Sequence, residues 1–280
     1  MILKTLFVYL KACKWGALSL ICLCISLLSG LIVALQYDPA TPYYATAAMD
    51  LLVPFGMDFR SLHFYSSQFF FLLAIIHLIT AFDSTDSYTS AQWGRLVIAL
   101  PVMLLLLFTG YVLRQDSTGS SAGFIAESIL VAIPVVGPAL NGALLSIADH
   151  GMQRVYVSHI ITLDLLWLVL AWEHLRRYRI RFTDHLPAAG MVLLFSVFIA
   201  APLDPEKLGV TYISGPWFFL GLQELLRYLP PLLAGFLFPA IFILALFFTQ
   251  KRYSFFVSVL ILLAVWLFSY LILTVMALSH

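Results

Sequence analysis

Four of the seven histidines lie inside two long apolar stretches of the sequence. His63 and His77 are 14 residues apart, and His159 and His174 are 15 residues apart. In an α-helix, 14 residues return to within about 40° of the same face after a rise of about 21 Å, and 15 residues return to within about 60°. Each stretch therefore presents two imidazoles toward one side, at two depths. Polar groups in such apolar stretches are costly in lipid and are usually functional.

Imidazoles that meet at one depth from two helices can bind haem iron from both sides. If both stretches run in the same direction, His63 lies level with His159 and His77 lies level with His174. Zinc would need more ligands at one level. Hydrogen bonding across helices is the alternative for any single histidine, but it does not explain why depth and face match in all four. We therefore predict two bis-histidine iron sites, His63/His159 and His77/His174.

The elements that must position these histidines are membrane spans, because the chain is 62% hydrophobic and only 10% charged, with a mean hydropathy of +0.99. Seven segments approach the roughly 20 apolar residues that a spanning helix needs. They cover 14–36, 60–82, 93–113, 153–175, 186–202, 231–250 and 254–278. We predict an all-α membrane protein of seven transmembrane helices, with a four-helix di-haem domain over 1–182 and a three-helix domain over 183–280. The net charge of +1 gives no indication of a nucleic-acid partner.

Positive charge orients this arrangement, because ten lysines and arginines fall on one side and five on the other. The ten are Lys4, Lys11, Lys14, Arg95, Arg176, Arg177, Arg179, Arg181, Lys251 and Arg252, and the five are Arg60, Arg114, Arg154, Lys207 and Arg227. The positive-inside rule then predicts a cytoplasmic N-terminus and a C-terminus on the outer side. We expect the membrane to be a bacterial inner membrane, so that the outer side is the periplasm. Three long connections, 37–59, 114–152 and 203–230, mix apolar and polar residues with prolines. Such segments favour short interfacial helices, here on the outer face.

Residues near the histidines suit haem. Arg60 and Arg154 lie at the outer ends of the second and fourth spans, where cations would pair with the haem propionates. Gly16 and Gly30 are again 14 residues apart in the first span, and they would leave room for a bulky group at both depths. The alternative for the two glycines is ordinary small-residue helix packing.

Several segments resemble, in chain order, cytochrome b of the quinol:cytochrome c oxidoreductases, the bc-type complexes. They are "GALSLICLCISLLSG", "RSLHFYSS", "FTGYVL", "SILVAIPVVG" and "RVYVSH". The resemblance covers about residues 12–182, and the histidine spacing is similar to the photosynthetic type. It implies two b-type haems, a quinone substrate and a homodimer within a larger complex. The implied partners are a Rieske iron–sulfur protein, a c-type cytochrome (multihaem cytochromes included), or both.

The C-terminal part resembles the family less closely. "SGPWFFLGLQELLRY" is similar to the segment that carries the family's Pro-Glu-Trp-Tyr motif at the outer quinol site. Trp217 matches its first aromatic residue, but Pro216 replaces the glutamate that usually accepts a proton. The family's Pro-Trp after "GYVL" is also replaced, by Arg114 and Gln115. By this resemblance Tyr111, Trp217 and the "AIPVVG" hairpin would wall the outer quinone site.

Two acids could replace the missing glutamate as the base. Glu224 lies two helical turns past Trp217, and Glu127 lies in the other surface segment. The alternative for Glu224 is an exposed acid paired with Arg227 three residues later.

The resemblance also points to a second quinone site and to a third haem. Asp184, at the start of the fifth span, is similar to the family's acidic residue at the inner quinone site; the alternative is a solvated, basic helix end. Photosynthetic-type relatives attach an extra haem to a cysteine two residues before the first glycine. Here Cys13 lies three residues before Gly16, so a third haem near Cys13 stays open.

The sequence thus predicts a di-haem subunit of a membrane quinol/quinone oxidoreductase complex. It contains no CxxCH motif, so its electron partner must be another subunit. One alternative is a di-haem anchor of another dehydrogenase or reductase, which needs the four histidines but neither the surface hairpin nor "GPWFF". The other is a seven-span transporter, which should show inverted repeats and broken helices at mid-membrane, and neither is visible.

Overall fold

The computed structural model describes residues 13–147, 151–178, 181–205 and 213–279, and over these ranges the chain is helical, with no strand. The predicted all-α membrane class is therefore confirmed. Lys4, Lys11, Arg179 and Lys207, which entered the charge count, lie outside the described residues.

Five helices are long and apolar enough to cross a membrane: Trp15–Gln36, Gly56–Thr80, Ser90–Leu113, Met152–Leu175 and Phe256–Leu278. Each agrees with a predicted span to within a few residues, so these five are confirmed as long apolar helices. The predicted spans 186–202 and 231–250 correspond to two shorter apolar helices, Phe182–Phe198 and Leu232–Phe247.

The shorter helices have local causes. The fifth predicted span begins with a 3₁₀ turn, η4 (Phe182–His185), and continues as α10 (Leu186–Phe198); the backbone turns extended at Ile199, just before "APLDP". The sixth begins with the π-helical turn η5 (Leu232–Leu237) after two prolines, and continues as α12 (Phe238–Phe247). Proline cannot donate the backbone hydrogen bond that a helix interior needs, so Pro230 and Pro231 mark the start of the sixth segment, and Pro202 follows shortly after the fifth segment ends.

The chain divides into two compact units, and each unit is made of stretches that are not contiguous in the sequence. The first comprises residues up to 38, 44–89 and 171–202, and the second 39–43, 90–170 and 203 onward. The predicted division at residue 182 stays a prediction.

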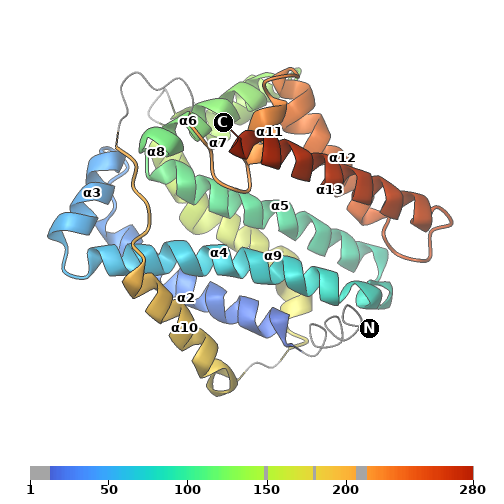
Figure 1. Cartoon of the computed structure of the whole chain (residues 1–280), viewed down its shortest axis with the longest axis horizontal. Coiled ribbons are helices and arrows are strands. Elements are labelled where there is room, and N and C mark those ends of the chain that lie inside the picture. The colour runs from blue at the N-terminus through green and yellow to red at the C-terminus, as the bar shows by residue number, and fades with distance from the viewer. Residues whose placement is uncertain (1–12, 148–150, 179–180, 206–212, 280) are drawn as a thin grey trace. The chain divides into compact units, whose positions relative to one another are not determined.

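In the first unit, α2 (Trp15–Gln36) packs along α4 (Gly56–Thr80), and α10 packs on α4 as well (Figure 1). Ser19 Oγ donates a hydrogen bond to the carbonyl oxygen of Phe70, at 3.0 Å. The ring of Tyr65 packs edge-on against Phe195 of α10, with 4.9 Å between centroids. The unit also contains α3 (Pro42–Leu52) and the 3₁₀ turn η1 (Phe82–Ser87).

In the second unit, α5 (Ser90–Leu113) contributes more buried residues than any other helix. It is joined through the surface helices α6 (Ser117–Val131) and α7 (Gly137–Leu144) to a span made of α8 (Met152–Val157), the π-helical turn η3 (Ser158–Leu163) and α9 (Asp164–Leu175). From Ala171 on, α9 belongs to the first unit. The short α11 (Leu220–Leu225) packs on α13 (Phe256–Leu278). The hydroxyl of Tyr270 in α13 donates to the carbonyl oxygen of Phe218, at 2.7 Å. All three long connections thus contain short helices, as predicted.

Candidate functional site

His77 and His174 lie together in the first unit. His77 comes from α4 and His174 from the last turn of α9, and their ring centroids are 5.8 Å apart with the planes tilted by 49°. The ring of Tyr178 lies 5.0 Å from that of His174. The structure therefore brings together one of the two histidine pairs that the intervals predicted.

Tyr88 touches His174, and sequence reasoning did not identify it. Its hydroxyl lies 2.9 Å from Nδ1 of His174. Tyr88 follows η1, in the connection between two spans. Burial raises the pKa of Tyr88, so the hydroxyl is protonated at neutral pH. A histidine that binds iron through Nε2 carries its proton on Nδ1, so the phenol oxygen of Tyr88 is placed to accept that proton's hydrogen bond.

His63, in α4, is oriented by the neighbouring helix α2. Its Nδ1 lies 2.9 Å from the carbonyl oxygen of Ser26 and 3.3 Å from the Ser26 hydroxyl. A carbonyl oxygen can only accept, so Nδ1 carries the proton and donates. The lone pair is then on Nε2, the nitrogen that can bind iron. Metal-binding histidines are commonly fixed in this way.

His159, in the second unit, is oriented by α5. Its Nδ1 lies 2.9 Å from Oγ1 of Thr109. The Thr109 hydroxyl is itself 2.8 Å from the carbonyl oxygen of Leu105, to which it donates. The threonine oxygen is therefore left to accept from Nδ1–H, and His159 has the same tautomer as His63. His63 and His159 belong to different units, so their pairing stays a prediction.

Glycines face three of the four histidines. A haem fits beside a histidine only where the facing helix carries no bulky side chain. A Cβ placed on Gly16 would lie 3.1 Å from the ring of His77, one on Gly30 would lie 2.7 Å from the ring of His63, and one on Gly110 would lie 3.0 Å from the ring of His159. The helix surface beside each imidazole thus lacks a side chain, as a flat and bulky ligand requires. Gly16 and Gly30 were predicted from their spacing. Gly110 was missed, although "FTGYVL" contains it.

The 15-residue interval of the fourth span contains a π-helical turn. Its residues, Ser158–Leu163, include His159. A π turn closes its hydrogen bond over five residues rather than four, so it takes up one residue more than an α turn. With this turn, the 15 residues from His159 to His174 give about the same rotation and rise as 14 α-helical residues, which is the interval between His63 and His77. π turns inside α-helices are frequent at functional sites.

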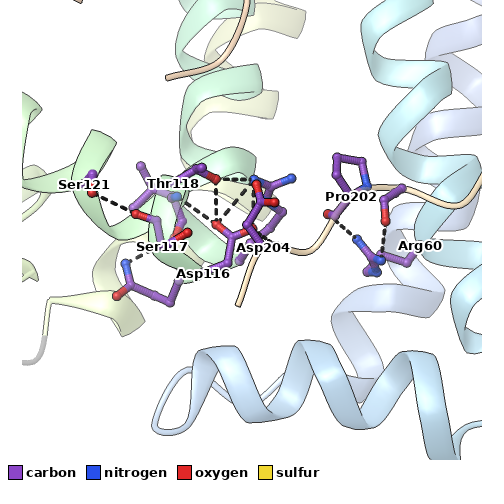
Figure 2. Close-up of polar contacts among 12 residues, drawn as sticks. Arg60, Asp116, Ser117, Thr118, Ser121, Pro202 and Asp204 are labelled. Atoms are coloured by element: carbon purple, nitrogen blue, oxygen red, sulfur yellow. Dashed lines mark hydrogen bonds and ion pairs between the residues drawn. The ribbon is translucent and has the colours of Figure 1, made fainter. Parts of the chain in front are cut away.

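The two predicted propionate partners differ. Arg60 is buried and forms a two-pronged ion pair with Asp50 of α3: Nε is 2.6 Å from Oδ1, and the second nitrogen contacts Oδ2. It also donates to the carbonyl oxygens of Ala201 and Pro202, at 2.7 and 3.3 Å (Figure 2). Arg60 therefore ties α4 to α3 and to the connection after α10. Arg154 is exposed at the start of the fourth span.

Arg114, which stands where the resemblance expected a proline, forms a buried ion pair with Asp116, at 3.0 Å. Asp116 also accepts from the backbone amides of Gly119, at 2.8 Å, and Asp204, at 3.0 Å (Figure 2). The guanidinium carbon of Arg114 lies 4.3 Å from the centre of the Tyr111 ring. This corner between α5 and α6 thus holds both Tyr111 and the connection that leads to "GPWFF".

A pocket lies between α6 and the segment 213–223, all within the second unit. It is lined from α6 by Thr118, Ser121, Ala122 and Ile125, and from the other segment by Ile213, Gly215, Pro216, Phe219 and Gln223. Gln223 fixes this segment, because its side chain accepts from the amide of Gly215 at 2.7 Å and donates to the carbonyl oxygen of Ile213 at 2.8 Å. The lining does not include Tyr111 or Trp217.

The predicted acids fall into different surroundings. Glu224 is fully buried, so its exposure in the alternative interpretation is wrong, whereas its pairing with Arg227, at 3.1 Å, is confirmed. The hydroxyl of Tyr228 also donates to Glu224, at 2.8 Å. Glu127 accepts from the backbone amide of Ile147.

The remaining predicted residues are exposed. Asp184 lies at the surface in η4, with the hydroxyl of Thr183 3.5 Å away. Trp217 is 46% exposed, beside the buried Phe218. Cys13 is exposed just before α2. Over the described ranges, no three histidine, cysteine or acidic side chains gather in a way that could hold a metal ion.

Comparisons with known proteins agree with these features. The family model for cytochrome b/b6/petB matches residues 7–180. Cytochrome b6 of Heliomicrobium gestii is 28% identical over 179 residues, covering 59% of this chain and 81% of that protein. Cytochrome b of Bugula neritina is 24% identical over 260 residues, covering 79% and 70%. A solved structure, "Hyperthermophilic respiratory Complex III", has a similar fold, with a TM-score of 0.63 at 21% identity over 94% of this chain and 82% of that one.

Proposed function

Because the chain belongs to the cytochrome b/b6 family, whose members bind b-type haem, we propose that it is the di-haem subunit of a membrane quinol/quinone oxidoreductase complex. It would pass electrons between quinone sites and partner redox subunits across the membrane. The observation that carries the proposal is the setting of the histidines. Three of them face a glycine, and three have an oxygen partner at Nδ1.

His63 and His159 would hold one haem, and His77 and His174 the other. Haem bound there supplies one-electron redox chemistry at two levels, which the 14-residue interval separates by about 21 Å. The protein holds the Nδ1 atoms of His63, His159 and His174 with oxygen partners, and the glycines Gly16, Gly30 and Gly110 leave no side chain beside His77, His63 and His159. Arg154, which is exposed, is our proposed propionate partner. Arg60 would have to leave Asp50 to take that role.

The outer quinone site would use the pocket between α6 and the segment 213–223. Its lining is mostly apolar with a few polar groups, as is typical of small-molecule sites, and it includes Gly215, Pro216 and Phe219 of the segment that resembles the family's Pro-Glu-Trp-Tyr segment. Tyr111 and Trp217 border this region in the sequence and stay our predicted wall residues. Glu224 is our proposed proton acceptor. It adjoins Gln223 of the pocket, and Arg227 and Tyr228 hold its carboxylate.

Further parts of the proposal rest on the sequence. An inner quinone site with Asp184, a Rieske protein or c-type cytochrome as partner and a homodimeric complex are what the resemblance implies. A cytoplasmic N-terminus in a bacterial inner membrane rests on the distribution of positive charge. Seven crossings would require the two shorter helices, Phe182–Phe198 and Leu232–Phe247, to span as well.

Haem stoichiometry and potentiometry of the purified membrane complex test the proposal. We expect two b-type haems per chain with distinct potentials, one lost in His63→Ala or His159→Ala and the other in His77→Ala or His174→Ala. His185→Ala, outside the proposed pairs, is the control and should keep both. No b-type haem, or haem insensitive to these four histidines, would overturn the proposal.

Glu224→Gln tests the outer site separately. If Glu224 accepts the proton, quinol oxidation by the complex falls at least tenfold while both haems remain reducible by dithionite. Glu127→Gln tests the other candidate acid; because Glu127 is bound to the backbone amide of Ile147, we expect this variant to keep the wild-type rate. Unchanged quinol oxidation in Glu224→Gln would remove this residue from the mechanism and would favour the anchor alternative if no acid substitution affects the rate.

A further inference from the structure

Three of the four proposed haem ligands have an Nδ1 partner, and these partners differ in kind. Ser26 and Thr109 stand on membrane-spanning helices. Tyr88 stands in a connection, after η1, and reaches His174 across 86 positions of sequence. Tyr88 is also the only one of the three that offers a phenol.

Tyr88 is held firmly enough to determine how His174 is oriented. Its backbone amide donates to the carbonyl oxygen of Thr85, at 3.1 Å, and so fixes it at the end of η1. The guanidinium carbon of Arg177 lies over its ring, 4.7 Å from the centre. Each of these residues belongs to the first unit.

The direction of the Tyr88–His174 bond follows from ligand chemistry. If His174 binds iron through Nε2, its proton must be on Nδ1, and Tyr88 Oη can accept from it at 2.9 Å. A hydrogen bond from Nδ1–H makes an imidazole more basic and fixes the orientation of its ring. A more basic ligand favours ferric over ferrous iron, so the bond lowers the reduction potential.

We infer that Tyr88 is a positioning residue for His174, accepting the hydrogen bond from Nδ1 and thereby lowering the reduction potential of the haem held by His77 and His174. This inference rests on the proposed function, because it assigns a role toward a haem that His174 would bind. It adds to that function a residue from outside the spans that sets the potential of one haem and not of the other.

The test is a potentiometric titration of the complex carrying Tyr88→Phe, which keeps the ring and removes the acceptor. We expect unchanged haem content, a higher potential for one haem and an unchanged potential for the other. A shift of up to tenfold in the reduction equilibrium constant, 59 mV for one electron, is the expected range. His77→Ala identifies which potential belongs to the haem at this level.

Controls separate the possible failures. Tyr253→Phe removes a phenol in the second unit, whose ring packs on Phe248 and Phe255, and should move neither potential. Tyr88→Gln, whose amide oxygen can accept, should give a potential between those of the wild type and Tyr88→Phe. It also keeps the test valid if Tyr88→Phe loses the haem.

Three outcomes would overturn the inference while leaving the proposed function standing. They are two haems with unchanged potentials in Tyr88→Phe, equal shifts at both haems, and a Tyr88→Gln potential above that of Tyr88→Phe. Absence of haem from the wild-type complex would instead defeat the proposed function itself.

Discussion

The two proposed histidine levels differ in where their Nδ1 partners stand. His63 and His159 are oriented by Ser26 and Thr109, which stand on the spanning helices α2 and α5. His174, at the other level, is oriented by Tyr88, which stands in a connection between spans. Orientation at the first level therefore depends on helix packing, whereas orientation at the second depends on a segment outside the spans. Partners on packed helices are displaced less easily than a partner in a connection, so we expect the first level to be less responsive to its surroundings.

The two glycines of α2 also differ, in how closely each approaches its histidine ring. The position of a Cβ on Gly30 is 2.7 Å from the ring of His63, and on Gly16 it is 3.1 Å from the ring of His77. The first distance is too short for any real contact, whereas small shifts could relieve the second. The His63 level is thus the tighter one.

Gly30→Leu should have the largest effect. The new side chain would occupy the position of the His63 ring, so one haem should be lost and the content should fall from two to one per chain. Gly16→Leu should lose haem less completely. Gly190→Leu is the matched control, because Gly190 lies in α10 and a Cβ there would meet nothing within 4 Å. Pyridine haemochrome assays of the three variants measure this, and equal haem content in Gly30→Leu and Gly190→Leu would contradict it.

Deletions in the fourth span test the π turn. Removing Ile161 from η3 should convert that turn to an α turn and keep both haems, because the alignment of His159 and His174 is preserved. Removing Leu168 from α9 leaves the π turn in place and rotates His174 by about 100°, so the haem at its level should be lost. Absorption spectra of the two deletion variants measure the difference. If both deletions lose the same haem, the π turn does not compensate for the extra residue.

The long helices were predicted well from the sequence, because the length of an apolar stretch directly gives the length of the helix that can span a membrane. Gly16, Gly30 and the histidines were predicted from intervals within one helix. Gly110, Thr109 and Tyr88 were missed, because each acts on a residue of another segment: Thr109 lies 50 positions from His159, and Tyr88 lies 86 from His174. No interval within one helix reveals such contacts. The buried pair of Arg114 and Asp116 was likewise visible only as a departure from the family pattern.

Thr109→Val should have a smaller effect, on the His63/His159 level alone. Valine keeps the shape of threonine but cannot accept from Nδ1 of His159, so the potential of that haem should rise by about 30 to 60 mV, roughly a three- to tenfold change in the equilibrium constant. Thr274→Val, at a hydroxyl in α13 that donates to Tyr270, is the control. Potentiometric titration measures the shift; a change in the other haem's potential would mean that the levels are not independent.

Arg177→Gln should have the smallest effect, and on the opposite level. The Arg177 guanidinium is exposed and lies over the Tyr88 ring. A nearby positive charge favours ferrous iron, so removing it should lower the potential of the His77/His174 haem, in the direction opposite to Tyr88→Phe. Because an exposed charge contributes less than about 1 kcal/mol in water, the shift should be smaller than that of Thr109→Val and should shrink as salt screens the charge. Titrations at two ionic strengths test both points. In the wild type, a salt dependence of the His63/His159 potential without one of the His77/His174 potential would contradict the contrast between the two levels. The haem that responds to its surroundings would then be the one whose histidines are oriented by residues of spanning helices.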